Sequence, residues 1–380
     1  MNLWHTLLFT LRLCGALALL GSVLLPNTGT AQAEKAPNSP LIKCWSHPAN
    51  VLPHNGIATD SDNVYFVSGE NKVNAIDVKT GETVWSSEVG GNLISEIVVT
   101  NRSIYAVSAG ASETGPTFLR SLSRSTGLTT WSVELRFAEK YFIGETTAGI
   151  VVAASNGDIW TINEGDGTMK WKGAFTGTLS APPRIGKAGI VIGTTAKKVE
   201  VFAAADGKRV RSMDVQFVPA LVGNGTSSAA VYSDERGGVY SSEIDSGQRN
   251  WKFKAGGKIG DMLTFEGKIL VSSADNFVYL MSADYGNILW KRRMPGRIAN
   301  SGLIAADLAA VTVIGERMAY VIDLDSGRIV DQIALTGDDA FLLTSIRANG
   351  EYVIAATANG LTGFSTGCGK DKRPSEKLIR

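Results

Sequence analysis

The sequence repeats one short pattern with a period of about 40 residues. Its clearest copy runs from Lys72 to Trp85: a short apolar run, an acid, a Thr-Gly turn, and a tryptophan four residues after the glycine. A period this regular over nearly the whole chain predicts a repeat architecture, in which each repeat is one supersecondary unit. The repeat glycines are Gly81, Gly127, Gly167, Gly207, Gly247, Gly286, Gly327 and Gly367.

Each repeat is rich in residues that favour β-strands. From Asn63 to Asp77, β-branched and aromatic residues alternate with Gly, Asn and Asp, and no stretch of the chain keeps helical spacing for three turns. About 40 residues hold about four strands of five or six residues with tight turns, which is the size of one propeller blade. The sequence therefore predicts an all-β fold, an eight-bladed β-propeller of four-stranded blades.

The two ends of the repeat region each hold part of one repeat. Lys43 to Ser46 matches Thr83 to Ser86, so the region begins with the tryptophan strand of a blade. Tyr352 to Cys368 matches the earlier strands of a repeat and stops where the tryptophan strand would follow. We therefore expect the N-terminal strand to complete the C-terminal blade, which closes the ring and removes free sheet edges.

The first 33 residues have the composition of a signal peptide. A weakly basic start precedes an apolar run from Leu13 to Leu25, and Ala31 and Ala33 fit the small-x-small pattern that signal peptidase cuts. We expect cleavage after Ala33, no transmembrane segment in the mature chain, and a periplasmic or secreted protein. The other expected regions are a polar lead at 34–40, the propeller at 41–369 and a basic polar tail at 370–380.

The repeat resembles that of the quinoprotein-type (PQQ-like) β-propeller family, in which Ala-Leu/Ile-Asp is followed by x-x-Thr-Gly-x-x-x-Trp. The best copies run from Ala75 to Trp85 and from Ser242 to Trp251. The resemblance covers nearly the whole mature chain and implies that the tryptophans dock between blades, buried where two sheets meet. Arg211 and Asp331 depart from the pattern, so those junctions are expected to be less apolar or filled by other side chains. The expected docking tryptophans are Trp45, Trp85, Trp131, Trp171, Trp251 and Trp290.

The family contains enzymes and protein-binding propellers. The enzymes add long loops, a calcium site and, in many members, a disulfide between adjacent cysteines against the quinone. Here the mature cysteines, Cys44 and Cys368, are far apart in sequence, and the repeats hold to about 40 residues. In size and plan the chain is similar to the propeller lipoproteins of the outer-membrane barrel-assembly machinery, although Cys14, preceded by Arg12 and Leu13, lacks the context of a lipidation cysteine.

These features predict an exported, non-enzymatic propeller that serves as a protein-binding or scaffolding module in the cell envelope, with outer-membrane protein assembly as the setting that the resemblance implies. The alternative is a quinone (PQQ)-dependent dehydrogenase or a degenerate relative of one. We expect no catalytic, cofactor-binding or metal-ligating residues, and a chain that is monomeric by itself. His47 and His54 are interpreted as polar surface residues because no carboxylate or cysteine accompanies them. The aspartates near the turn glycines are interpreted as turn caps: Asp77, Asp206, Asp245, Asp284 and Asp325.

Two clusters of basic residues are candidate contacts for a partner. The chain has 37 Lys and Arg against 36 Asp and Glu, so no general attraction to nucleic acid is expected. A local cluster can still bind an acidic protein segment or an anionic envelope polymer, and the alternative is that both clusters are solvated surface. One cluster comprises Lys197, Lys198, Lys208, Arg209 and Arg211, and the other comprises Lys291, Arg292, Arg293 and Arg297.

Cys44 and Cys368 are expected to form a disulfide. In the repeat alignment Cys368 takes the place of Glu82, just after the turn glycine, and Cys44 takes the place of Val84, just before the tryptophan. The two cysteines therefore belong to one blade, although only a closed ring brings them together. Export to an oxidising compartment and the even number of mature cysteines favour the bond over two unrelated thiols.

Overall fold

The computed structural model describes residues 40–51, 56–110, 115–186, 189–224, 228–305, 307–335, 345–349, 352–357 and 360–368. The expected signal peptide, nearly all of the polar lead, His54 and the tail at 370–380 lie outside these residues. Within them the named elements are all β-strands, and no helix long and apolar enough to cross a membrane is present. The predicted all-β class is confirmed.

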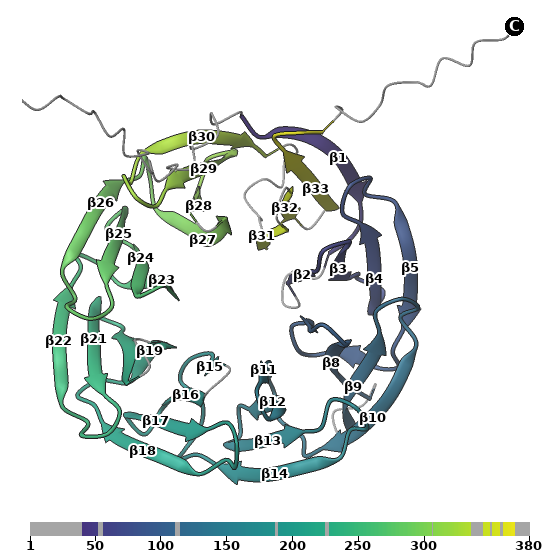
Figure 1. The fold of residues 1–380 in the computed structure, drawn as a ribbon, viewed down its shortest axis with the longest axis horizontal. Coiled ribbons are helices and arrows are strands. Elements are labelled where there is room, and N and C mark those ends of the chain that lie inside the picture. Colours follow the sequence, from purple (N-terminus) through teal and green to yellow (C-terminus); the bar gives the residue numbers. More distant parts are fainter. Residues whose placement is uncertain are drawn as a thin grey trace, which may run out of the picture. The chain divides into compact units, whose positions relative to one another are not determined.

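The strands form eight antiparallel sheets around a ring (Figure 1). In seven of the described sheets four strands run from the centre of the ring outwards, and in the remaining sheet β6 (Asn92–Leu93) and β7 (Val98–Val99) share the inner position. The predicted eight-bladed propeller of four-stranded blades is therefore confirmed. From inner to outer strand the blades are β2 (Ile57–Thr59), β3 (Asn63–Val67), β4 (Lys72–Asp77) and β5 (Thr83–Glu88); β6 and β7, β8 (Ser103–Ala109), β9 (Thr117–Ser123) and β10 (Thr129–Leu135); β11 (Tyr141–Thr146), β12 (Gly149–Ala154), β13 (Asp158–Ile162) and β14 (Met169–Ala174); β15 (Arg184–Ile185), β16 (Gly189–Thr194), β17 (Lys198–Ala203) and β18 (Arg209–Asp214); β19 (Pro219–Asn224), β20 (Ala229–Asp234), β21 (Gly238–Glu243) and β22 (Arg249–Lys254); β23 (Ile259–Phe265), β24 (Lys268–Ser273), β25 (Phe277–Ser282) and β26 (Ile288–Arg293); β27 (Ile298–Ala305), β28 (Leu308–Val313), β29 (Met318–Asp323) and β30 (Ile329–Ala334); and β31 (Ser345–Asn349), β32 (Tyr352–Thr357), β33 (Gly360–Ser365) and β1 (Ile42–Pro48).

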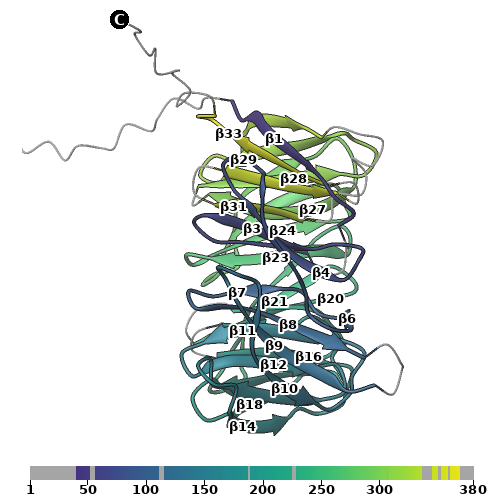
Figure 2. The same ribbon diagram turned by 90° about the vertical axis from the view of Figure 1, so that its right-hand side faces the viewer.

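The last blade is built from both ends of the chain, as predicted. Strand β1 pairs antiparallel with β33, from Ile42 opposite Ser365 to Pro48 opposite Gly360. Figure 2 shows these two strands side by side at one edge of the ring. The N-terminal strand therefore completes the C-terminal blade, and its hydrogen bonds close the propeller.

Apolar side chains fill the junctions between neighbouring blades. Every residue of β12 and β20, the second strands of their blades, is buried, because both faces of the strand contact another sheet. In one junction Val151 and Ile159 of one blade pack with Ile192 and Phe202 of the next. The core is thus a ring of inter-blade clusters, and each blade depends on its two neighbours.

The repeat tryptophans dock each blade onto the next one. Each lies on an outermost strand and donates its indole N–H to a carbonyl oxygen just before the next repeat glycine, as Trp171 does to Ala204 at 3.2 Å. Trp45 is 7% exposed, whereas the other five are only half-buried, because solvent lies on the outer side of these strands. The expected burial between sheets is therefore partial. The remaining donor and acceptor pairs are Trp45 and Val78, Trp85 and Arg124, Trp131 and Glu164, Trp251 and Ala283, and Trp290 and Leu324.

A β-bulge precedes every docking residue. On β5, Trp85 pairs with Ala75 and Thr83 pairs with Ile76, so Val84 is an extra residue in the ladder. A bulge increases the local twist and re-aims the neighbouring side chain, here towards the next blade. The bulged residues are Cys44, Val84, Thr130, Lys170, Val210, Asn250, Leu289 and Val330.

The repeat glycine meets two requirements at once. Gly207 has a φ of 67°, a left-handed conformation that disfavours side chains. It also lies directly under a docked ring, so a Cβ at this position would overlap the indole of Trp171. The regular spacing of glycine and tryptophan in the sequence follows from this contact.

We expect Gly207→Ala to lower the free energy of unfolding by about 2 kcal/mol, because backbone strain and a displaced indole add together. Gly267→Ala is the matched control: Gly267 has a φ of 71°, and an added Cβ would meet no atom within 4 Å. The control is expected to lose about 1 kcal/mol from strain alone. Denaturant unfolding measures both values, and equal losses would contradict the docking role of the glycine.

The two junctions without tryptophan use different contacts. Arg211 donates from Nε to the carbonyl oxygen of Ile244 at 2.7 Å, which is the bond that an indole makes elsewhere, and Met213 lies beside the glycine of that junction, Gly247. Asp331 instead accepts a hydrogen bond from the backbone N–H of Leu41 at 2.6 Å. Asp331 thereby holds the start of the closing strand.

Candidate protein-binding site

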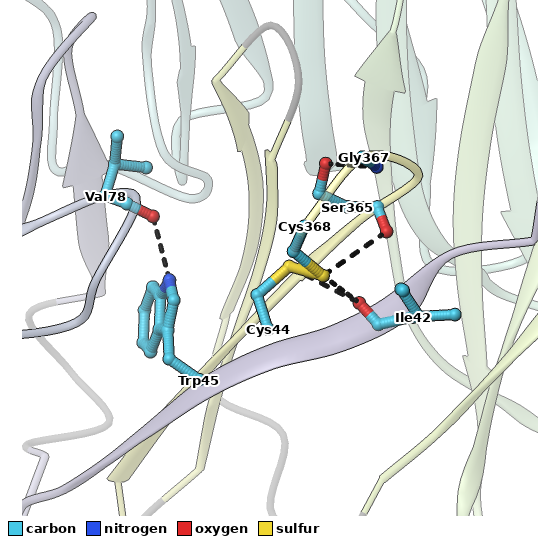
Figure 3. Close-up of a disulfide and its surroundings, with 7 residues drawn as sticks. All are labelled: Ile42, Cys44, Trp45, Val78, Ser365, Gly367 and Cys368. Atoms are coloured by element: carbon cyan, nitrogen blue, oxygen red, sulfur yellow. Dashed lines mark hydrogen bonds between the residues drawn. A yellow bond between two sulfur atoms is a disulfide. The ribbon is translucent and has the colours of Figure 1, made fainter. Parts of the chain in front are cut away.

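A disulfide between Cys44 and Cys368 links the two ends of the ring (Figure 3). The two Cα atoms are 5.5 Å apart, although 324 residues separate the cysteines in sequence. Cys44 is the extra residue of the bulge before Trp45, so it has no partner residue on β33. Cys368 follows the last strand. The predicted bond is therefore present, and it covalently fastens β1 to the blade that it completes.

The first basic cluster is largely used within the chain. Lys198 pairs with Asp214 at 2.7 Å and Lys208 pairs with Asp206 at 2.9 Å. Arg209 forms a 3.1 Å ion pair with Glu200, whose side chain is fully buried. Because Arg211 supplies the docking bond described above, four of the five basic side chains already have partners on their own blade or the next.

The structure separates the second basic cluster into two places. On the outermost strand β26, the ammonium of Lys291 lies 5.6 Å from the ring centroid of Phe277, and Arg292 donates from Nε to the carbonyl oxygen of Gly327 at 2.6 Å. Arg293 is exposed at the end of that strand. Arg297 lies in the following loop, which leads to the inner strand β27, and so it does not share a surface with the other three.

Arg297 lines a cavity of about 350 Å³ between the starts of the inner strands β23 and β27, which we call the inner-strand cavity. Lys258 lines it too, and this residue occupies the same repeat position as Arg297, seven residues after the docking tryptophan. Ser272, Ser273 and Asn300 add hydroxyl and amide groups. The residues at this position in the other described repeats are uncharged: Asn92, Ala138, Thr178 and Val218.

The inner-strand cavity is also lined by a half-buried acid, Asp261. Burial raises the pKa of this carboxyl above its usual value, although hydrogen bonds from Ser301 Oγ (2.9 Å) and the backbone N–H of Met262 (2.8 Å) oppose the shift. Two cations of neighbouring blades thus line the same cavity as an acid whose charge is disfavoured. The cavity is therefore suited to an anionic group held by Lys258 and Arg297. Sequence reasoning missed Lys258, which alignment on the tryptophans would have revealed.

Two other candidate residues, His47 and Asp77, have structural contacts. His47 Nδ1 is 2.8 Å from the carbonyl oxygen of Gly81, and its ring meets Phe66 edge-on. Asp77 caps its turn by accepting the N–H groups of Lys79 and Thr80, each at 2.8 Å. Over the part of the chain that the structure describes, no three His, Cys, Asp or Glu side chains gather closely enough to hold a metal ion.

Comparison with known families and proteins gives one family and two relatives. The family model described as "Outer membrane protein assembly factor BamB" matches residues 25–147 and 197–361. The chain is 22% identical over 323 residues to outer membrane protein assembly factor BamB of Yersinia pestis, which covers 82% of this chain and 71% of that protein. It is 24% identical over 325 residues to the protein of the same name from Moranella endobia (strain PCIT), covering 83% and 73%.

Solved structures with the same fold include a natural and a designed propeller. The crystal structure of BamB from Moraxella catarrhalis superposes with a TM-score of 0.61 at 16% identity, covering 85% of this chain and 97% of that one. The computationally designed Ika8 protein gives a TM-score of 0.69 at 12% identity, covering 86% and 99%. At these identities the likeness concerns the fold alone.

Proposed function

The chain belongs to the family described as "Outer membrane protein assembly factor BamB", and we propose on this premise that it is a non-enzymatic propeller that binds protein partners during outer-membrane protein assembly. The proposal includes export through a signal peptide cleaved after Ala33, and action in the cell envelope. Both relatives carry the same assembly-factor name, which supports the setting. The ring supports the role, because a rigid array of blades holds many loops in fixed positions.

The proposal rests on the position of two cations, Lys258 and Arg297, which both line the inner-strand cavity. Lys258 also forms a 2.6 Å ion pair with Glu235, but both side chains are more than half exposed, and such surface pairs contribute little and exchange readily. An aspartate or glutamate of a partner can therefore compete for Lys258 while Arg297 binds it through two N–H groups. The partner we propose is an acidic segment of an envelope protein.

Charge reversal tests this assignment. We expect Lys258→Glu/Arg297→Glu to reduce capture of an outer-membrane assembly component from an envelope extract at least tenfold, because a carboxylate partner would then meet two like charges. The matched control is Lys291→Glu/Arg293→Glu, which makes the same charge change on the outermost strand β26. Quantitative mass spectrometry of the captured proteins measures both. Equal capture by the two variants, or a partner unrelated to the outer membrane, would contradict the proposal.

A further inference from the structure

A second cavity, of about 390 Å³, lies at the other end of the strands from the inner-strand cavity. It is formed by the turns β7–β8, β11–β12 and β13–β14, and its charged lining residues are Arg102, Glu145, Glu164 and Lys170. Because neighbouring strands are antiparallel, these turns and the loops entering the inner strands lie at opposite ends of the blades. We call this the turn cavity. It is separate from the surface assigned to the assembly partner.

Glu164 is unusual for its place in the repeat. Its carbonyl oxygen accepts the indole N–H of Trp131 at 3.0 Å, so the backbone performs the docking role found at the other tryptophan junctions. The side chain is then available for another purpose, and it is only 15% exposed. The residues that supply the same carbonyl in other blades are mostly apolar: Val78, Ala204, Ile244, Ala283 and Leu324, with Arg124 as the exception.

The carboxylate of Glu164 lacks a hydrogen-bond donor among the described residues. Arg102 approaches it only to 4.0 Å and is itself 73% exposed, and Lys170 donates instead to the carbonyl oxygen of Ala148. Burial raises the pKa of Glu164, and the charge of Glu145 raises it further, while Arg102 and Lys170 only partly oppose this. A largely enclosed acceptor without a donor is less well solvated than one in water, so the cavity favours a ligand that brings donors and positive charge.

The neighbouring junction shows what fills this position elsewhere in the ring. Arg124 is the repeat equivalent of Glu164, since its carbonyl oxygen accepts the N–H of Trp85. Its guanidinium binds the buried carboxylate of Asp60, with Nε to Oδ2 at 2.9 Å. Tyr65 donates to the same oxygen at 2.6 Å. In the adjacent pair of blades, the guanidinium at this repeat position therefore binds a carboxylate of the same chain.

At the turn cavity the same turns are present, but no guanidinium lies within hydrogen-bond distance of the carboxylate, since Arg102 stays 4.0 Å from Glu164. Thr100 occupies the repeat position of Asp60, and its hydroxyl caps the equivalent turn of the next blade. Tyr105 stands in place of Tyr65, and its hydroxyl is buried with no hydrogen-bond partner among the described residues. Here the carboxylate is supplied by Glu164, and Glu145 of β11 lines the same cavity. The close intramolecular pair has thus been replaced by two carboxylates, the more distant cations Arg102 and Lys170, and an open volume.

We propose that the turn cavity binds the guanidinium group of an arginine side chain from another polypeptide, with its N–H groups donated to Glu164 and Glu145. Guanidinium presents five donors in a planar fork and is less strongly hydrated than ammonium, which suits two carboxylates in a half-enclosed site. Arg102 and Lys170 at the cavity reduce the attraction. They therefore set a weak affinity for an isolated arginine side chain.

The test is a titration of ¹⁵N-labelled protein with N-acetyl-arginine amide. Binding is followed at the indole N–H resonance of Trp131, because this N–H donates to the carbonyl oxygen of Glu164. We expect this resonance to shift and Glu164→Gln to weaken binding at least tenfold. Glu164→Gln keeps the backbone carbonyl, so the tryptophan stays docked. Glu243→Gln, in the corresponding turn two blades away, is expected to bind as the unaltered protein does. N-acetyl-citrulline amide, the neutral analogue, is expected to leave the resonance unmoved.

A second variant separates loss of binding from loss of folding. Arg102→Gln removes a competing cation and is expected to strengthen binding several-fold, which a damaged site cannot do. The proposal is overturned if Glu164→Gln titrates like the unaltered protein, if the citrulline compound binds equally well, or if Arg102→Gln weakens binding. The last result would mean that the cavity recognises an anion.

Discussion

Replacing Cys44 and Cys368 together by serine is expected to lower the free energy of unfolding by about 5 kcal/mol. The disulfide closes a loop of 324 residues, and on the chain-entropy model so long a loop greatly restricts the unfolded chain. The folded ring still keeps its β1–β33 hydrogen bonds and the bond from Trp45 to Val78. The loss should therefore appear as reduced stability of a ring that remains closed under native conditions.

Denaturant unfolding with and without a reducing agent measures this effect. The reductant should bring the unaltered protein down to the stability of the double serine variant and leave that variant unchanged. Circular dichroism and tryptophan fluorescence before unfolding should match, because the blade contacts persist. Recovery of both cysteines as free thiols in non-reducing peptide maps, or equal stability of the oxidised protein and the variant, would remove the bond from this account.

The architecture could be predicted from the sequence because each repeat carries its own turn and docking signals. The repeat glycine must adopt a positive φ and lie under the docking ring of the preceding repeat, as Gly207 does under Trp171. The spacing of these glycines therefore gives the blade length. The split repeat at the two ends predicted the ring closure and, through the alignment of Cys44 with Val84, the disulfide. These signals recur in most repeats, so a single sequence was enough to predict the architecture.

Side-chain substitutions at single junctions could not be predicted in the same way. Arg211 makes the hydrogen bond of an indole, and nothing in residue type alone indicates that a guanidinium will take this geometry. The half-burial of five tryptophans was missed for a similar reason, since a pattern places them on a strand but does not say that the strand is outermost.

The candidate site was predicted only in part, because charge runs in sequence need not share a surface. Lys291 to Arg293 and Arg297 are close in the chain, yet an outermost strand and an inner-strand loop separate them in space. Lys258 joins Arg297 across 39 residues because equivalent positions of neighbouring blades lie side by side. In a propeller, the informative comparison is therefore between equivalent repeat positions, and it identifies both the Lys258 and Arg297 pair and the exceptional Glu164.

Replacing Arg124 by methionine is expected to cost about 3 kcal/mol of stability at neutral pH, because it leaves a buried carboxylate without its cation. Asp60 is 11% exposed and Arg124 is 27% exposed, so water replaces the lost contact poorly. Burial alone would raise the pKa of Asp60, but hydrogen bonds from Tyr65, from two backbone N–H groups and from Arg124 hold it below its usual value. Burial and the hydrogen bond to Asp60 raise the pKa of Tyr65 to about 12, although Arg124 opposes this shift.

The pH dependence of this loss identifies its electrostatic origin. A lowered folded-state pKa means that Asp60 contributes stability above its unfolded value, near pH 4, and that this contribution disappears as the pH falls through the folded-state pKa. Without Arg124 the pKa of Asp60 must rise, so the difference between the unaltered protein and Arg124→Met should be largest at pH 7 and shrink as the pH falls below about 4.

Arg120→Met is the matched control, since Arg120 Nε donates to the neutral hydroxyl of Ser108 at 2.7 Å and the loss of stability in this variant should not vary with pH. Unfolding curves between pH 7 and pH 3 measure both differences. A pH-independent loss in Arg124→Met would mean that the side chain stabilises the junction by packing and not through the charge of Asp60.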